Sequence, residues 1–151
     1  MKHVLFATLL LLPIVASASM VDHIQVKDPY VRAMPTNQIN SAAYFEVVND
    51  NDKAMELVSV SSPVAEKVEL HEVIMKDGVA SMQAVMRIVV EPKTTVSLAP
   101  GGMHVMLLGL KDTLKPGQSV PLTLTFSDGE SKTIDAVVRD IRTPAQHEHH
   151  H

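Results

Sequence analysis

Two histidines and two methionines in this sequence could together hold a soft metal ion. They are His71, Met82, His104 and Met106. Imidazole nitrogen and thioether sulfur suit Cu(I) better than they suit the harder divalent ions. The sequence contains no cysteine, so the usual thiolate ligands for a soft metal are not available. The residue types therefore predict a Cu(I) site built from neutral ligands.

Strand geometry would place these four side chains on one face of a sheet. His104 and Met106 stand two residues apart, so on a strand their side chains would point the same way. Asp77-Gly78 predicts a two-residue hairpin turn, because both positions accept positive backbone angles. The turn would make His71 and Met82 diagonal neighbours, about 7–8 Å apart. The expected cross-strand pairs are Val73 with Met82 and His71 with Ala84. A three-residue loop would change the alternation and remove this argument.

Each of these residues also has a purely structural interpretation. Methionine is a flexible gap filler in hydrophobic cores, and a single histidine is more often a surface or packing residue than a ligand. The combination favours a metal site. His71 and His104 are the two histidines of the strand-rich region, and each has a methionine on its expected face.

The spacing of the four residues resembles the signature of a known family. His71, ten residues, Met82, twenty-one residues, His104, one residue and Met106 match the motif His-x10-Met-x21-His-x-Met of the PCu(A)C family of periplasmic copper chaperones. The resemblance covers residues 24 to 138, including the segment Gly-Gly-Met-His-Val-Met-Leu at 101–107.

The resemblance implies both a fold and a function. The fold would be a cupredoxin-like or immunoglobulin-like β domain that binds one Cu(I) near its surface through the four motif residues. The family is linked to copper delivery to the binuclear copper centre of cytochrome c oxidase, directly or with a Sco-type thiol protein. The expected partners are therefore the copper subunit of the oxidase or a Sco-type protein.

Neutral ligands also fit a role in transfer. Two imidazoles and two thioethers leave the charge of Cu(I) uncompensated and bind it with moderate strength. A cysteine-based acceptor supplies thiolate, a stronger donor, so the ion can move downhill by ligand exchange.

Residues beside the motif could support the site. Glu69 shares the expected face of His71 and could hydrogen-bond its imidazole, although a solvated strand edge is the favoured interpretation for both Glu69 and Glu72. Met75 and Met86 share the same predicted face and could line the site or serve simply in packing. Met103 neighbours His104 but has the opposite parity to Met106, so core packing is expected for it. Met34 and Met55 show no tie to the motif.

Short apolar stretches separated by turn residues predict an all-β fold. No stretch keeps a helical period beyond two turns, and the turn signals recur at regular spacing. The expectation is an antiparallel Greek-key domain over residues 19–143, a cupredoxin-like or immunoglobulin-like sandwich or barrel. A chain of this length can bury a core that folds without metal. The expected strands cover 24–33, 42–48, 55–61, 64–75, 79–86, 94–98, 103–110, 120–126 and 132–139.

The N-terminal segment has the pattern of an export signal. A short basic start and an apolar run precede Ala16-Ser17-Ala18, so cleavage is expected after Ala18 and the mature protein is expected in the periplasm. An uncleaved N-terminal anchor is the alternative. A lipoprotein signal is not expected, because it requires a cysteine at the cleavage point.

The C-terminal segment 144–151 is rich in histidine. Its imidazoles could form a secondary site for Cu(II) or another divalent ion on a flexible tail, or they could be part of a purification tag or a nonspecific metal-binding tail. These histidines are His147, His149, His150 and His151.

Composition and motifs bear on other functions. The net charge of −4, the lack of a basic cluster and the few aromatic residues disfavour nucleic-acid binding. No recognisable Ser/His/Asp arrangement or P-loop indicates an enzyme, and stable membrane insertion after cleavage is not expected. Two alternatives to delivery stay open: periplasmic copper storage or resistance, and a β-sandwich module that binds a protein without metal.

Overall fold

The computed structural model describes residues 12–14 and 16–141, and within these ranges the chain is built from β-strands. The histidine-rich tail and most of the predicted signal segment lie outside the described residues. One short 3-10 helix, Met20–His23, precedes the strands. The strands are β1 (Ile24–Arg32), β2 (Asn40–Asn49), β3 (Met55–Ser61), β4 (Ala65–Lys76), β5 (Val79–Ala84), β6 (Ile88–Val90), β7 (Thr94–Leu98), β8 (His104–Leu110), β9 (Ser119–Phe126) and β10 (Ser131–Arg139).

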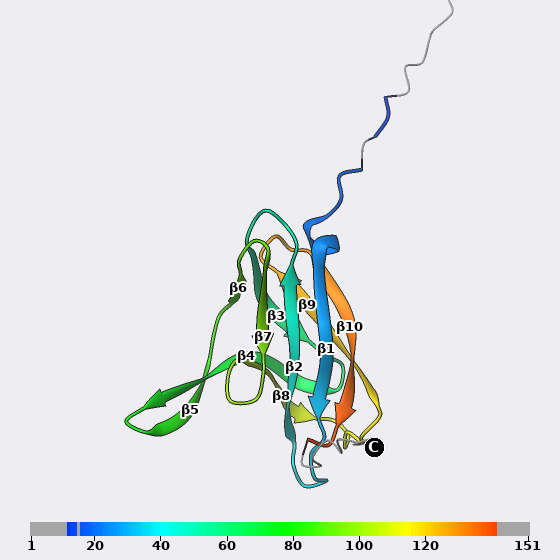
Figure 1. Ribbon diagram of the computed structural model, residues 1–151. Helices are drawn as coiled ribbons and strands as arrows, with labels where there is room; N and C mark the ends of the chain where they lie inside the picture. Colours follow the sequence, from blue (N-terminus) through cyan, green and yellow to red (C-terminus); the bar gives the residue numbers. More distant parts are fainter. Residues whose placement is uncertain (1–11, 15, 142–151) are drawn as a thin grey trace, which may run out of the picture.

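The strands form one continuous sheet that wraps around a shared interior (Figure 1). Their order is β5-β4-β8-β2-β1-β10-β9-β3-β6, and β7 pairs with the second half of β2. The predicted all-β class is confirmed, and the sheet is not closed into a barrel. One pair departs from the expected antiparallel pattern: β1 and β10 run parallel. A parallel pair needs a long connection, and here the whole domain lies between the two strands.

The β4–β5 hairpin has the predicted register. Asp77 and Gly78 have φ angles of 53° and 78°, as a tight two-residue turn requires. Val73 pairs with Met82 and His71 pairs with Ala84. The hairpin projects from the body of the domain (Figure 1), so its outer strand β5 is at one end of the sheet.

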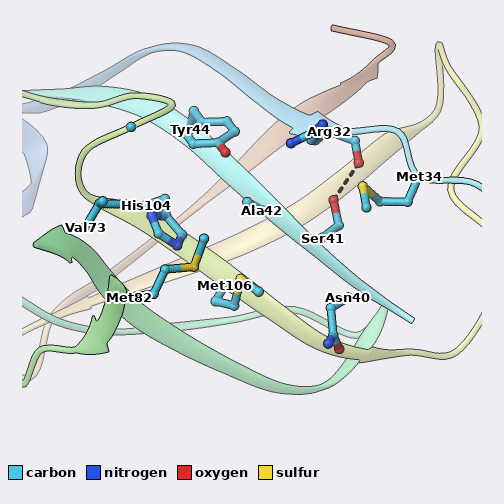
Figure 2. Close-up of a pocket in the computed structure, with 11 residues that line it drawn as sticks. Arg32, Met34, Asn40, Ser41, Ala42, Tyr44, Val73, Met82, His104 and Met106 are labelled. Atoms are coloured by element: carbon cyan, nitrogen blue, oxygen red, sulfur yellow. Dashed lines mark hydrogen bonds between the residues drawn. The ribbon is translucent and has the colours of Figure 1, made fainter. Parts of the chain in front are cut away.

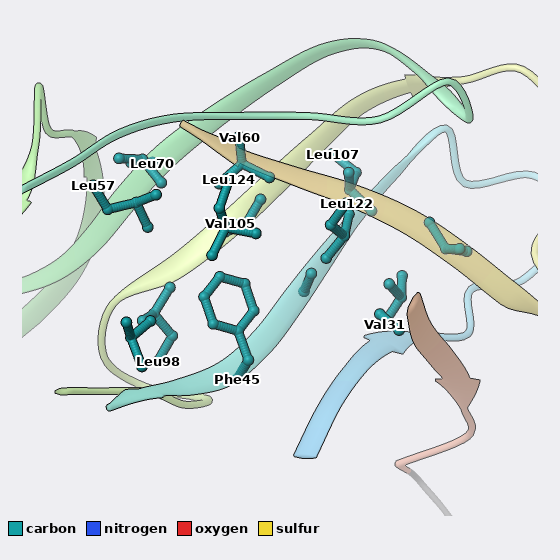
Figure 3. Packing of buried hydrophobic residues seen from close by; sticks show 14 of the residues in the cluster. Val31, Phe45, Leu57, Val60, Leu70, Leu98, Val105, Leu107, Leu122 and Leu124 are labelled. Atoms are coloured by element: carbon teal, nitrogen blue, oxygen red, sulfur yellow. The ribbon is translucent and has the colours of Figure 1, made fainter. Parts of the chain in front are cut away.

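The hydrophobic core lies on the inner face of the sheet. Phe45, Leu107, Leu122 and Leu124 are almost fully buried there (Figure 3). On β8 the side chains alternate, with Val105 and Leu107 in the core and His104 and Met106 on the opposite face. The core therefore fixes the position of the strand while leaving its other face for chemistry.

Candidate metal centre

Three neighbouring strands bring the four motif residues together. His71 on β4 and His104 on β8 are directly paired, with ring centroids 5.7 Å apart. Met106 follows two residues after His104, on the same face, and Met82 on β5 is diagonal to His71. Figure 2 shows the side chains of Met82 and Met106 beside the ring of His104. The predicted juxtaposition of the four side chains is thus present in the fold.

Each of the two motif histidines has one ring nitrogen that forms no hydrogen bond with a described residue. His104 Nδ1 lies 3.0 Å from the carbonyl oxygen of Gly102, which can only accept, so Nδ1 carries the proton and Nε2 has the lone pair. His71 uses Nε2 to contact Glu69 at 2.7 Å. The other ring nitrogens, His104 Nε2 and His71 Nδ1, are buried and form no hydrogen bond. Among the described residues, no other buried side-chain nitrogen or oxygen lacks a partner.

Two unpaired buried nitrogens require a physical explanation. Leaving such an atom unsatisfied costs about 1–3 kcal/mol, and native proteins rarely do so without a reason. A metal ion would accept both lone pairs at once. Within the described residues, no group of three or more histidine or acidic side chains is arranged to hold a metal. The donor set is therefore imidazole with thioether, which fits Cu(I).

Glu69 forms a direct contact with the ring of His71, which was the less favoured interpretation of this residue. The carboxylate also pairs with Lys67. The hydrogen bond to His71, followed by the one to Lys67, holds the pKa of Glu69 below its usual value. An ionised Glu69 accepts a hydrogen bond from Nε2–H of His71, which leaves the lone pair of the ring on Nδ1. Glu72, in contrast, accepts a hydrogen bond from Gln83 at the surface.

Removing the Glu69 carboxylate tests this orienting contact. We expect Glu69→Ala to weaken Cu(I) binding about 10- to 100-fold, because partners of metal-binding histidines commonly contribute that much. Competition with a chromophoric Cu(I) chelator measures the change. Glu72→Ala removes the neighbouring exposed carboxylate and should leave the affinity unchanged. Equal affinities for the two variants would contradict the proposed role of Glu69.

Three of the four motif residues, all except His71, line a cavity of about 140 Å³. Its walls include Met82, His104 and Met106, joined by Arg32 and Met34 (Figure 2). The prediction that Met34 has no tie to the motif is wrong in position, because Met34 lines the same cavity as Met106. Spacing could not have indicated that Arg32 and Met34 line the site. Both precede His71 by more than thirty residues in the chain, and no periodic pattern connects them to the motif.

Tyr44 forms another wall of this cavity. Its ring lies 6.3 Å from the ring of His104 and 5.3 Å from that of Tyr30, and burial raises the pKa of its hydroxyl. Tyr44 therefore supports the buried side of the His104 imidazole and stays protonated at neutral pH.

The remaining methionines divide between surface and core. Met75 and Met86 are 68% and 90% exposed, so packing does not account for them, and neither lines the cavity. β5 ends at Ala84, before Met86, so the alternation that would have placed Met86 on the site face does not reach it. Met55 is buried in the hydrophobic core. Met103 packs against this core, as expected.

Met82 gives the site access to solvent. It is 60% exposed on the outermost strand, whereas His104 is only 3% exposed. The site therefore has a buried imidazole side and an open thioether side, which agrees with the expectation of a site near the surface.

Comparison with known proteins agrees with the fold and with the family resemblance. The family model described as "Putative lipoprotein LpqE-like" matches residues 24–138. The chain is 36% identical over 120 residues to "Putative lipoprotein Lxx21020" of Leifsonia xyli subsp. xyli, covering 79% of this chain and 71% of that protein. It is 32% identical over 100 residues to "Uncharacterized protein RP573" of Rickettsia prowazekii, covering 66% of this chain and 55% of that protein. The chain thus spans little more than half of the Rickettsia relative.

Solved structures of PCuAC domains have the same fold. The copper-bound PCuAC domain from PmoF2 aligns with a TM-score of 0.67 and 28% identity over 78% of this chain and 93% of that domain. The Cu(I) form of DR1885 from Deinococcus radiodurans aligns with a TM-score of 0.64 and 32% identity over 77% of each chain. This chain belongs to the LpqE-like family, which is related to the PCuAC copper-binding domains.

The predicted secondary metal site is at the C-terminus. His147, His149, His150 and His151 lie outside the described residues, so their predicted Cu(II) site stays a prediction. Among the residues that the structure describes, no helix is long and apolar enough to cross a membrane.

Proposed function

We propose that this protein binds one Cu(I) ion through His71, Met82, His104 and Met106 and acts as a copper chaperone. The observation that carries this proposal is the pair of buried, unpartnered imidazole nitrogens beside two thioethers on the same sheet face. The copper-bound PmoF2 domain and the Cu(I) form of DR1885 support it as relatives of the same fold.

The geometry suits release as well as binding. His71 and His104 come from paired positions on two adjacent strands, so their separation is set by the sheet. Met82 is exposed on the edge strand β5 and is the ligand that an acceptor reaches first. Replacement of a thioether by a thiolate gives a stronger bond to Cu(I), so transfer to a cysteine-containing acceptor is downhill.

The proposed place of action is the periplasm, after export by the N-terminal signal. Relatives named as lipoproteins support an envelope location, while this chain has no cysteine to carry a lipid. The proposed acceptor is the copper subunit of cytochrome c oxidase, reached directly or with a Sco-type thiol protein. Storage would need the same copper site but no acceptor.

A transfer assay separates delivery from storage. We expect the Cu(I)-loaded protein, lacking residues 144–151, to donate its ion to the apo form of a soluble oxidase copper domain or a Sco-type protein under anaerobic conditions. Copper in each protein is measured after rapid separation. If the ion stays on this protein despite a tighter-binding acceptor, the storage function is favoured and delivery is contradicted.

A further inference from the structure

Arg32 carries a charge next to the candidate copper site, and this charge has no ion-pair partner among the described residues. Its side chain is half-buried, lines the cavity with Met106 and His104, and forms no ion pair or hydrogen bond with another described residue. The neighbouring cation in the β1–β10 register is Arg139. Arg139 pairs with Asp28 at 2.7 Å and lies over the ring of Tyr30, so its charge is already compensated.

The sheet register places Arg32 close to the ligand Met106. Met106 pairs with Ala42 on β2. Val31 pairs with Ala43, so the next pair of that antiparallel ladder is Arg32 with Ala42. Ala42 thus separates Met106 from Arg32 by a single small side chain, which leaves the floor of the cavity open (Figure 2).

The cavity also offers hydrogen-bond donors, besides the lone pair of His104 Nε2 that is assigned to copper. The Asn40 Oδ1 atom already accepts from the backbone N–H of Gly109, which leaves the amide NH₂ of Asn40. The hydroxyl proton of Ser41 is already donated to the carbonyl oxygen of Arg32, whereas the hydroxyl of Tyr44 in the same cavity wall can donate to a bound group. No carboxylate among the described residues lines this cavity. A cavity with donors and an uncompensated guanidinium selects an anion.

We propose that this cavity binds the thiolate that takes Cu(I) from the protein, and that Arg32 holds the thiolate beside the metal. This inference rests on the proposed function. Arg32 favours negative charge at one end of the cavity, while the thioethers and Cu(I) at the other end favour a soft donor. Thiolate, the metal-binding form of cysteine, satisfies both.

The exchange step needs no redox partner. The thiol loses its proton to solvent, the thiolate sulfur forms a bond to Cu(I), and the bond from Cu(I) to a methionine sulfur breaks. The copper stays Cu(I) throughout. The thiolate can belong to a cysteine of an acceptor protein or to a small free thiol.

Exchange kinetics test the role of Arg32. The protein lacking residues 144–151 is loaded with one Cu(I) and mixed anaerobically with excess 2-mercaptoethanesulfonate at fixed ionic strength. Formation of the Cu(I)–thiolate complex is followed by its ultraviolet charge-transfer absorption. We expect Arg32→Gln to slow exchange about tenfold, since a charge in a cleft raises the local anion concentration by at least that factor. Arg139→Gln removes an equal charge from the next strand and should change the rate less than twofold.

A second arm distinguishes the source of the thiolate. The same variants are mixed with a peptide that carries two cysteines. Dependence on Arg32 for both thiols indicates a site for any thiolate, and dependence for the peptide alone indicates a site for a protein cysteine. Equal rates for wild type and Arg32→Gln with both thiols, or equal slowing by Arg32→Gln and Arg139→Gln, would overturn the inference.

A third arm uses the protein without copper. Iodide, a soft anion, is titrated while the methyl resonances of Met34 and Met106 are followed by NMR. We expect saturable shifts in wild type that are lost in Arg32→Gln; absence of such shifts in wild type would overturn the anion site. Failure of the proposed function is a separate result, in which the wild-type protein lacking 144–151 retains no Cu(I).

Discussion

Replacing both His104 and Met106 with alanine, in a chain lacking residues 144–151, should abolish the single tight Cu(I) equivalent of the protein. The double substitution removes one buried imidazole nitrogen and one thioether from the candidate site. The two remaining ligands, His71 and Met82, are on β4 and β5, and Met82 is largely exposed, so they cannot exclude water from the metal. We expect affinity to fall by more than about 100-fold, since even an indirect partner of a ligand contributes 10- to 100-fold.

Anaerobic titration against a chromophoric Cu(I) chelator measures this loss. Met75→Ala is the matched control, because Met75 is an exposed thioether on β4 that does not line the cavity. It should leave one tight equivalent in place. A tight equivalent that persists in the double variant would place the copper elsewhere, and loss of binding on deletion of 144–151 alone would assign it to the histidine-rich tail.

Local sequence rules were sufficient to predict the part of the site that depends on the β4–β5 hairpin and on strand alternation. Asp77-Gly78 permits one tight turn, and that turn fixes the register that aligns Met82 with Val73. His104 and Met106 share a face because strand alternation requires it. The direct pairing of His71 with His104 depends on β4 lying next to β8. Alternation alone does not specify that order, and the motif resemblance indicated only that the residues belong together.

The other half of the site depends on contacts between distant segments. Arg32, Met34 and Tyr44 reach the cavity because β2 lies next to β8 and β1 lies next to β2 in the sheet. Nothing in their local sequence signals a metal site. The contact between Glu69 and His71 follows strand parity, but the choice between a solvated carboxylate and a hydrogen-bonded one depends on side-chain packing that a sequence does not display.

The errors in the fold have similar physical causes. The strands expected from the sequence do not include β6, because its three residues are too few for alternation to be recognised. The parallel pairing of β1 and β10 joins the two ends of the domain, so no turn between them marks it. Local signals describe strands and hairpins well, whereas strand order is set by how the whole chain buries its apolar faces.

The side chains on the core face of β8 should determine the stability of the fold independently of copper. Leu107 is on β8 between Met106 and Leu108, with its side chain fully buried on the core face. We expect Leu107→Ala to lower the free energy of unfolding of the copper-free protein by about 2–5 kcal/mol, because it removes buried methyl groups and leaves a cavity. Urea unfolding followed by circular dichroism measures the change. Leu108→Ala, at the half-buried neighbouring position, should cost less than half as much.

Copper should stabilise wild type and Leu107→Ala by the same increment. Ligand binding adds a free energy set only by the ligand concentration and the dissociation constant, and Leu107 faces away from the site, so that constant should not change. Two results would contradict this account: copper-free wild type without a cooperative unfolding transition, or a Leu107→Ala variant that unfolds like wild type. The first would show that the metal, and not the core, holds the ligand strands in register, and the second would show that Leu107 does not stabilise the core.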